Sequence, residues 1–391
     1  MGLRPTYDAI DAFAPHRPST DADAASASHL DFLDGVRGCA ALYVVAHHAM
    51  LNLPPVASRV DALMRRAFAL GHFSVDVFIV LSGFCLMLPV LRRPGHVGLW
   101  PFIGRRAVRI LPAYYVALLC SLLLIGTVIG QPSGTHWDVS LPVTTRDVAL
   151  HMMLMHDWSA SSALRINHPF WSIAVEWKIY FLFPVLLWLR ARTGMTRTAG
   201  VALLSGYVGW LVLERTNALN PGPWGSSPYY VGLFALGMLA AELTTSARCR
   251  AWAVSAEGVA IFAAATVVLG ALALVESSAR GPLLPLQLAS APMGAWTGAL
   301  LLMLHAGALP RLSSALASRP SASLGRMGYS IYLVHAPLVQ LVHQYLVAPI
   351  SWPAACRPMI MVTLGALVTV LVAYPFYRLA ERPFHQLSRR L

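Results

Sequence analysis

The chain has 391 residues, of which 57% are hydrophobic and only 12% charged, with a formal net charge of +12. This composition excludes an ordinary soluble domain, in which about a quarter of the residues are charged. Apolar runs long enough to cross a bilayer recur along the chain, and none alternates in the manner of an outer-membrane barrel strand. We therefore expect an all-α fold, a polytopic membrane helical bundle.

The apolar runs predict about ten transmembrane helices within residues 31–385. A polar, disordered tail is expected at 1–30, and a short basic end at 386–391. Basic residues concentrate in alternate loops, and by the positive-inside rule this pattern places both termini in the cytoplasm and the protein in the inner membrane. The ten ranges are 33–52, 71–91, 109–130, 168–189, 198–213, 228–243, 254–275, 287–306, 327–347 and 357–379.

The first apolar run contains Arg37 and His48. Eleven residues turn a helix to within about 20° of its starting face, so the two side chains share a face and lie about 16 Å apart along the axis. Ionisable groups inside a membrane usually mark a functional site. The alternative is a snorkelling arginine and a mid-membrane histidine that bonds to a neighbouring helix. His47 lies about 80° off the shared face, so His48 is the better candidate.

The third run opens with Arg105, Arg106 and Arg109, three guanidiniums within about one turn. Planar guanidiniums bind phosphate well, so this segment predicts a phosphate-binding mouth on the cytoplasmic side. The alternative is ordinary anchoring by positive charge at the membrane surface.

The fourth run carries Ser172, Glu176 and Tyr180 at positions i, i+4 and i+8. This spacing places a polar stripe on one helix face, which is hard to explain by packing in hydrocarbon. Lys178 points elsewhere, and we expect it to pair with Glu176 or with Asp76, an acidic residue inside the second run.

The ninth run also contains polar residues. Tyr332 and His335 lie there at i and i+3, so their side chains are neighbours.

The sequence gives little sign of a metal or disulfide site. The five cysteines show no paired spacing, which favours free thiols over a disulfide framework or a zinc site. His151 and His156, five residues apart in the longest loop, could bind a metal, but such a loop pair seldom does, and we expect no metal site.

These segments together resemble the acyltransferase-3 family of integral membrane acyltransferases, in the family's order, from Leu33 to Phe384. The chain departs from many members where Trp177-Lys178-Ile179 follows the glutamate in place of Glu-Gln-Phe. The matching motifs are Arg-x10-His at Arg37 and His48, Asp76–Phe84, the paired arginines Arg106 and Arg109, Ser-x3-Glu-x3-Tyr at Ser172, Glu176 and Tyr180, Tyr329–His335, and Glu381-Arg382-Pro383.

The resemblance implies an O-acyltransferase that moves an acyl group, usually acetyl, from cytoplasmic acyl-CoA to a hydroxyl of a carbohydrate or related acceptor. Coenzyme A needs a cationic grip for its phosphates and a base about one pantetheine arm away, which the spacing of Arg37 and His48 provides. No permanently bound cofactor is expected. The implied roles are catalysis by His48 (general base or transient acyl carrier), Arg37 and Glu176, donor binding by Arg37, Arg105, Arg106 and Arg109, and acceptor binding by Asp76, Ser172, Tyr180, Tyr332 and His335.

Two other classes stay open at this point. A transporter or flippase of a glycan or lipid-linked substrate would also carry intramembrane Arg, Glu and His residues, but usually with internal repeats and broken helices in matching halves. A scaffolding membrane protein would not need the buried ionisable set. Nucleic acid is not an expected partner, because the basic residues are scattered among loops.

Overall fold

The computed structural model describes residues 31–55, 58–92, 97–220, 222–278 and 285–391, and the regular elements in these ranges are all helical. The expected all-α fold is therefore confirmed, whereas the predicted tail at 1–30 lies outside the described residues. The elements are α2 (Asp31–Leu51), α3 (Arg59–Phe68), η2 (Ala69–His72), α4 (Phe73–Arg92), α5 (Leu99–Leu124), η3 (Ile125–Ile129), η4 (His136–Ser140), α6 (Thr145–Met152), η5 (His156–Trp158), η6 (His168–Phe170), α7 (Trp171–Thr193), α8 (Met195–Thr216), α9 (Tyr229–Leu243), α10 (Ala247–Val254), α11 (Ala256–Ser278), α12 (Leu286–His305), α13 (Pro310–Leu316), α14 (Arg319–Arg326), α15 (Gly328–Val342), η7 (His343–Val347), α16 (Arg357–Phe376), η8 (Tyr377–Glu381) and α17 (Arg382–Ser388).

A helix lies at each of the ten ranges predicted to cross the membrane, but the number of crossings needs correction. In the described residues, five helices are long and apolar enough to span, or six if the bent pair α9 and α10 counts as one span. The count falls in part because α2 carries two aspartates, an arginine and two histidines, and because α9 has only 15 residues before the bend into α10. About 20 apolar residues are needed to cross the hydrocarbon core. The chain is a multi-pass membrane protein, and the side on which its termini lie stays a prediction.

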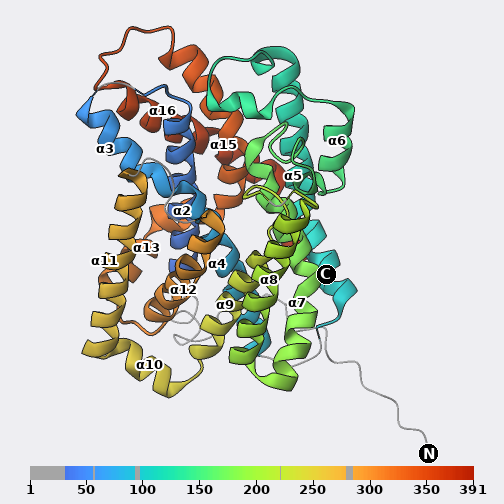
Figure 1. Ribbon diagram of the computed structural model, residues 1–391, viewed down its shortest axis with the longest axis vertical. Coiled ribbons are helices and arrows are strands. Elements are labelled where there is room, and N and C mark those ends of the chain that lie inside the picture. The colour runs from blue at the N-terminus through green and yellow to red at the C-terminus, as the bar shows by residue number, and fades with distance from the viewer. Residues whose placement is uncertain (1–30, 56–57, 93–96, 221, 279–284) are drawn as a thin grey trace, which may run out of the picture.

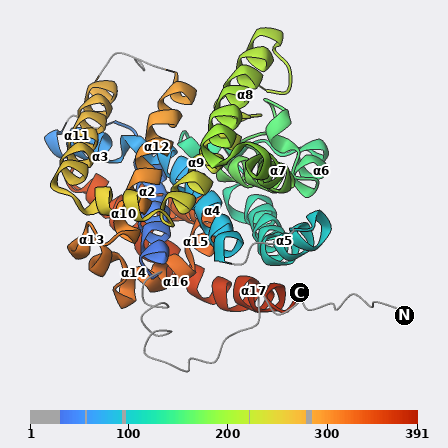
Figure 2. The same cartoon turned by 90° about the horizontal axis from the view of Figure 1, so that it is seen from below.

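Helix α2 occupies the middle of the bundle, where it packs against α4, α14, α15 and α16 (Figures 1 and 2). Its apolar side chains, among them Phe32, Val45 and Met50, are buried in the core of the protein. This central position surrounds Arg37 and His48 with side chains from other helices.

Two glycines bring α4 and α9 into close contact. A Cβ atom added to Gly237 would lie 1.9 Å from the carbonyl oxygen of Val80, and one added to Gly83 would lie 2.0 Å from that of Phe234. Any side chain at either position would push the helices apart. Such close backbone approach through small residues is typical of helix pairs in membranes, where no hydrophobic effect drives helices together.

The segment between α5 and α7 folds into short helices at the upper end of the molecule in Figure 1. It is tied to the bundle by side chains that donate hydrogen bonds. Trp137 Nε1 donates to the carbonyl oxygen of Ile129 at 3.0 Å, and Asn167 Nδ2 donates to Ser121 Oγ at 3.0 Å and to the carbonyl oxygen of Leu333 at 3.1 Å. These bonds hold η4 and η6 against the helical bundle.

The same segment contains the stacked pair His151 and His156. Both residues are fully buried, with ring centroids 3.8 Å apart and ring planes at 7°. Burial lowers the pKa of His151 to about 4 and lowers the pKa of His156 well below its usual range. The folded protein therefore holds both rings neutral at pH values at which exposed histidines are charged.

This pair predicts a loss of stability in mild acid. An unfolded histidine titrates near pH 6.5, so between pH 6.5 and about 4 only the unfolded chain binds the proton. The shift at His151 alone would lower the free energy of unfolding by about 3 kcal/mol across that window. We expect the decrease in Tm from pH 7 to pH 5, measured in detergent, to be smaller in His151→Phe than in the unsubstituted protein.

The control for this experiment is the range above pH 7. There the ring is neutral in both states, so the Tm difference between the two proteins should not vary with pH. Identical Tm decreases between pH 7 and pH 5 would contradict the assignment of a neutral, buried His151.

Candidate functional site

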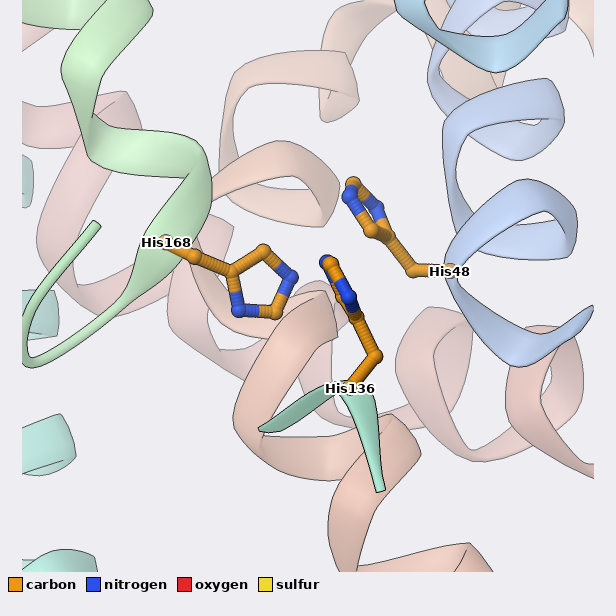
Figure 3. A group of neighbouring side chains, drawn as sticks. All are labelled: His48, His136 and His168. Atoms are coloured by element: carbon orange, nitrogen blue, oxygen red, sulfur yellow. The ribbon is translucent and has the colours of Figure 1, made fainter. Parts of the chain in front are cut away.

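Four histidine rings from four separate elements surround one point at the end of α2. His48 lies in the last turn of α2, with its ring centroid 4.8 Å from that of His168 in η6, 5.0 Å from that of His335 in α15 and 6.0 Å from that of His136 in η4 (Figure 3). His168 and His335 are buried, whereas His48 and His136 are partly buried. His48 thus lies near the end of α2, which stops three residues later at Leu51.

Hydrogen bonds define which nitrogen of His48 is free. His335 Nδ1 lies 2.7 Å from the carbonyl oxygen of Tyr332, and a carbonyl only accepts, so this Nδ1 carries a proton. In a neutral His335 the Nε2 atom is then an acceptor, and its partner at 2.9 Å is His48 Nδ1. His48 must donate through Nδ1, which leaves the lone pair of its Nε2 available. His47 faces another way, with Nδ1 at 2.7 Å from the carbonyl oxygen of Phe68.

The polar stripe on α7, formed by Ser172, Glu176 and Tyr180, makes two separate hydrogen-bonded contacts. Ser172 Oγ lies 2.7 Å from the hydroxyl of Tyr332, which also donates to the carbonyl oxygen of Pro169 at 3.0 Å. One turn further along, the Tyr180 hydroxyl donates to Glu176 at 2.5 Å. Within the described residues Glu176 has no hydrogen bond to His48, and its partner is Tyr180.

Arg37, Arg106 and Arg109 converge from α2 and α5. All three guanidiniums lie close enough to Cys85 to interact with it electrostatically. Arg37 pairs with Asp34 at 2.5 Å, but no carboxylate in the described part of the chain lies within ion-pair distance of Arg106 or Arg109. This arginine cluster (Arg37, Arg106 and Arg109) therefore carries excess positive charge, which suits an anionic ligand.

Two side chains border the arginine cluster. Glu381 interacts with Arg37 and Arg109, and its carboxylate accepts hydrogen bonds from the backbone N–H and hydroxyl of Ser330 at 3.1 and 2.5 Å. The ring of Tyr180 lies under the guanidinium of Arg106 at 5.2 Å, so the tyrosine that binds Glu176 also contacts the cluster.

Three predicted residues lie outside these groups. Arg105 is turned toward the C-terminal end of the chain, where it donates to the carbonyl oxygen of Leu391 at 3.4 Å. Asp76 is fully buried and faces Ser290 and Tyr230. The expected pairing of Lys178 with Asp76 or Glu176 is wrong, because Lys178 forms its ion pair with Asp157 from the segment between α5 and α7.

Sequence reasoning missed His136 and His168. Both follow turns outside the apolar runs or at their boundary, and no spacing rule relates either residue to His48, which is 88 and 120 positions away. The signal that could have indicated them is the number of histidines in the segment between α5 and α7, of which the sequence-based prediction considered only His151 and His156.

Comparisons with known proteins identify one family model and several distant relatives that match this chain. A family model described as an acyltransferase domain matches residues 30–378, which includes all of the histidine and arginine groups above but stops before Glu381. Acyltransferase MdmB from Streptomyces mycarofaciens is 23% identical over 363 residues, which cover 88% of this chain and 87% of MdmB. YrhL from Bacillus subtilis (strain 168) is 24% identical over 92% of this chain and 56% of its own length.

A shorter match joins the chain to O-acetyltransferase OatA from Staphylococcus aureus (strain NCTC 8325 / PS 47), 25% identical over 41% of this chain and 25% of OatA. The chain thus spans only about half of YrhL and a quarter of OatA. No solved structure matches. Since the family model covers most of its length, the chain belongs to the acyltransferase-3 family.

Proposed function

We propose that this protein is a membrane O-acyltransferase that moves an acyl group, in the simplest case acetyl, from cytoplasmic acyl-CoA to a hydroxyl of a carbohydrate or related acceptor. Membership of the acyltransferase-3 family supports acyl transfer as the reaction, as do the relatives MdmB, named an acyltransferase, and OatA, named an O-acetyltransferase. The observation that carries the proposal is the placement of Arg37 and His48 on α2. Arg37, a member of the arginine cluster, and His48, with its basic imidazole nitrogen, lie eleven residues apart on one helix, about 16 Å along its axis at 1.5 Å of rise per residue.

The arginine cluster is the proposed site of the coenzyme A phosphates. Planar guanidiniums bind phosphate oxygens in pairs, and the charges of Arg106 and Arg109 are not paired with a protein carboxylate within the described residues. The pantetheine arm would then run along the polar groups between the two ends. Tyr180 and Glu176 come first, because Tyr180 contacts Arg106, and Tyr332 and Ser172 follow.

In the proposed step, Nε2 of His48 removes the proton of the acceptor hydroxyl while its oxygen attacks the thioester carbonyl carbon. The new C–O bond forms, the C–S bond breaks, and the coenzyme A thiolate leaves with the proton that His48 had taken. The hydrogen bond from His48 Nδ1 to His335 keeps the free lone pair on Nε2 and stabilises the imidazolium that forms. His335 is thus a positioning residue.

The acceptor is expected to approach from the segment between α5 and α7, because this segment supplies the rings of His136 and His168 next to His48. The ring of Tyr332 contacts that of His335, and its hydroxyl bonds to Ser172 of the stripe on α7, so these two hydroxyls are placed to bind the acceptor or the thioester oxygen. A sugar hydroxyl and its neighbours offer both donors and acceptors to such groups.

His48→Ala is expected to lower acyl transfer by at least about a hundredfold, as for loss of a general base. The measurement is release of free thiol from acetyl-CoA by the purified protein in detergent, with membrane glycolipid extract as the source of acceptor. His47→Ala is the matched control and should keep most of the activity, because His47 bonds to the carbonyl oxygen of Phe68. Full activity in His48→Ala would exclude the proposed mechanism.

Direct transfer and a covalent acyl-histidine can be separated with radiolabelled acetyl-CoA in the absence of acceptor. Stoichiometric label on His48 would show that the histidine acts as a nucleophile, and direct transfer leaves the protein unlabelled.

Arg106→Lys is expected to weaken binding of acyl-CoA about tenfold without unfolding the protein, because an ammonium group cannot bind two phosphate oxygens as a planar guanidinium does. Arg106→Ala should bind more weakly still. The measurement is titration of the detergent-solubilised protein with a non-hydrolysable acyl-CoA analogue. Arg192→Ala, which removes an arginine that stacks on Trp188 at 4.2 Å, controls for loss of a cation–π contact. Equal affinity in Arg106→Ala and the unsubstituted protein would remove the cluster from the donor site.

Glu176→Gln is expected to reduce kcat about a hundredfold and also to weaken donor binding, because the amide keeps the shape of the carboxylate but loses the charge to which the Tyr180 hydroxyl donates beside the proposed path of the pantetheine arm. Tyr180→Phe tests the same contact from the other side and should reduce kcat less. If both variants lose folded protein in size-exclusion profiles, the carboxylate serves structure and not transfer.

A further inference from the structure

Three of the histidines at the end of α2 have ligand atoms close enough to share one ion. The nearest usable ring nitrogens of His48, His136 and His168 all lie within 4.8 Å of one another (Figure 3). The three side chains come from α2, η4 and η6, and Figure 3 shows their rings directed toward a common space. The sequence led us to expect no metal site, because it offered only the pair His151 and His156.

Two of these rings have a lone pair free to enter that space. His48 donates through Nδ1 to His335, so its Nε2 has no proton when both rings are neutral. His168 is only 4% exposed, and its Nδ1 lies 3.1 Å from Ser140 Oγ, whereas its Nε2 has no hydrogen-bond partner within the described residues. A buried ring nitrogen without a partner is costly and requires an explanation, such as an ion.

The third ring, His136, is partly buried, and its centroid lies 4.8 Å from that of His168. The neutral imidazole is the form that binds a metal ion. Three neutral imidazoles without a carboxylate favour zinc, copper or nickel and disfavour calcium and magnesium, which prefer oxygen ligands. The outer partners also fit, because ligating histidines usually bond their other ring nitrogen, as His48 does to His335 and His168 does to Ser140.

We propose that His48, His136 and His168 form a binding site for a divalent transition-metal ion, with Zn²⁺ the preferred species. Zinc–nitrogen bonds of 2.0–2.1 Å require ligand nitrogens about 3.3 Å apart in a tetrahedral site. The rings must therefore close by up to about 1.5 Å relative to the present 4.8 Å limit. Rotation about the side-chain torsions can supply this movement, and His136 and His168 both belong to short helical turns.

The proposal goes beyond acyl transfer, but it has one consequence that rests on the proposed function. A metal ion and the acceptor's proton would compete for the same lone pair on His48 Nε2. A bound ion would remove the general base, so Zn²⁺ would inhibit the transferase reversibly, and a chelator would restore activity. The fourth coordination position, opposite the three rings, would be filled by water.

Cobalt spectroscopy tests the site without any assay of activity. The full-length protein, purified in detergent without a histidine tag, is titrated with Co²⁺, which substitutes for zinc and absorbs strongly in a tetrahedral site. We expect one Co²⁺ per chain with tetrahedral d–d bands, displaced by one equivalent of Zn²⁺. No such bands in the folded protein, or bands only at several equivalents of Co²⁺, would overturn the proposal.

Two substitutions test the proposed ligands, and a third serves as the control. His136→Ala and His168→Ala should weaken Co²⁺ binding by more than the roughly 10–100-fold that loss of an outer partner costs. His343→Ala is the matched control, since this half-buried histidine lies in η7 and outside the cluster, and it should leave the bands unchanged. Unchanged binding in folded His136→Ala would contradict the assignment.

His136→Cys keeps the proposal testable if removal of a ring disturbs folding. A thiolate can replace an imidazole as a ligand, so this variant should retain Co²⁺ and gain a sulfur-to-cobalt charge-transfer band in the near ultraviolet. Absence of that band in a folded, Co²⁺-loaded variant would exclude position 136 from the site.

Thiol-release assays with and without Zn²⁺ separate this proposal from the proposed function. Co²⁺ binding together with inhibition by Zn²⁺ supports both. Binding without inhibition supports the metal site and contradicts the role of His48 as base. Normal transfer with no binding at all rejects the metal site and leaves the proposed transfer intact.

Discussion

The hydrogen bond between His335 and His48 is the interaction on which the chemistry of this protein depends. The carbonyl oxygen of Tyr332 determines which nitrogen of His335 carries the proton, and His335 in turn determines which nitrogen of His48 does. Without this chain of contacts, an imidazole at the end of α2 could adopt either tautomer, and its basic nitrogen would have no fixed direction. The backbone of α15 thus orients a lone pair that belongs to α2.

Helix α2 also sets the distance between the arginine end and the histidine end of the site. A helix is rigid over three turns, so Arg37 and His48 keep their separation as long as α2 stays continuous. The cost of holding ionisable groups in an apolar bundle is offset differently at the two ends. Arg37 has Asp34 and lies near Glu381, whereas the histidines remain neutral and bond to one another and to backbone carbonyl oxygens.

The segment between α5 and α7 completes the site at the end of α2. Asn167 and Trp137 fix it to the bundle, and the ion pair of Lys178 with Asp157 joins it to α7. The position where the sequence departs from many family members, Trp177-Lys178-Ile179, therefore serves in part to anchor this segment. A change there would act on the site through the placement of this segment, which carries His136 and His168.

The sequence by itself determined the class of protein, the helical segments and the family, because apolar length and local spacing along one helix are readable from residue order. It also placed Arg37 and His48 on one helix, since both belong to α2. Only the tertiary structure decided which helices meet. It brought His335, His136 and His168 to His48, gave Glu176 the Tyr180 hydroxyl as its partner, and paired Lys178 with Asp157. Contacts between residues far apart in the chain depend on helix packing and on how a connecting segment folds back, and neither leaves a periodic signal in the sequence.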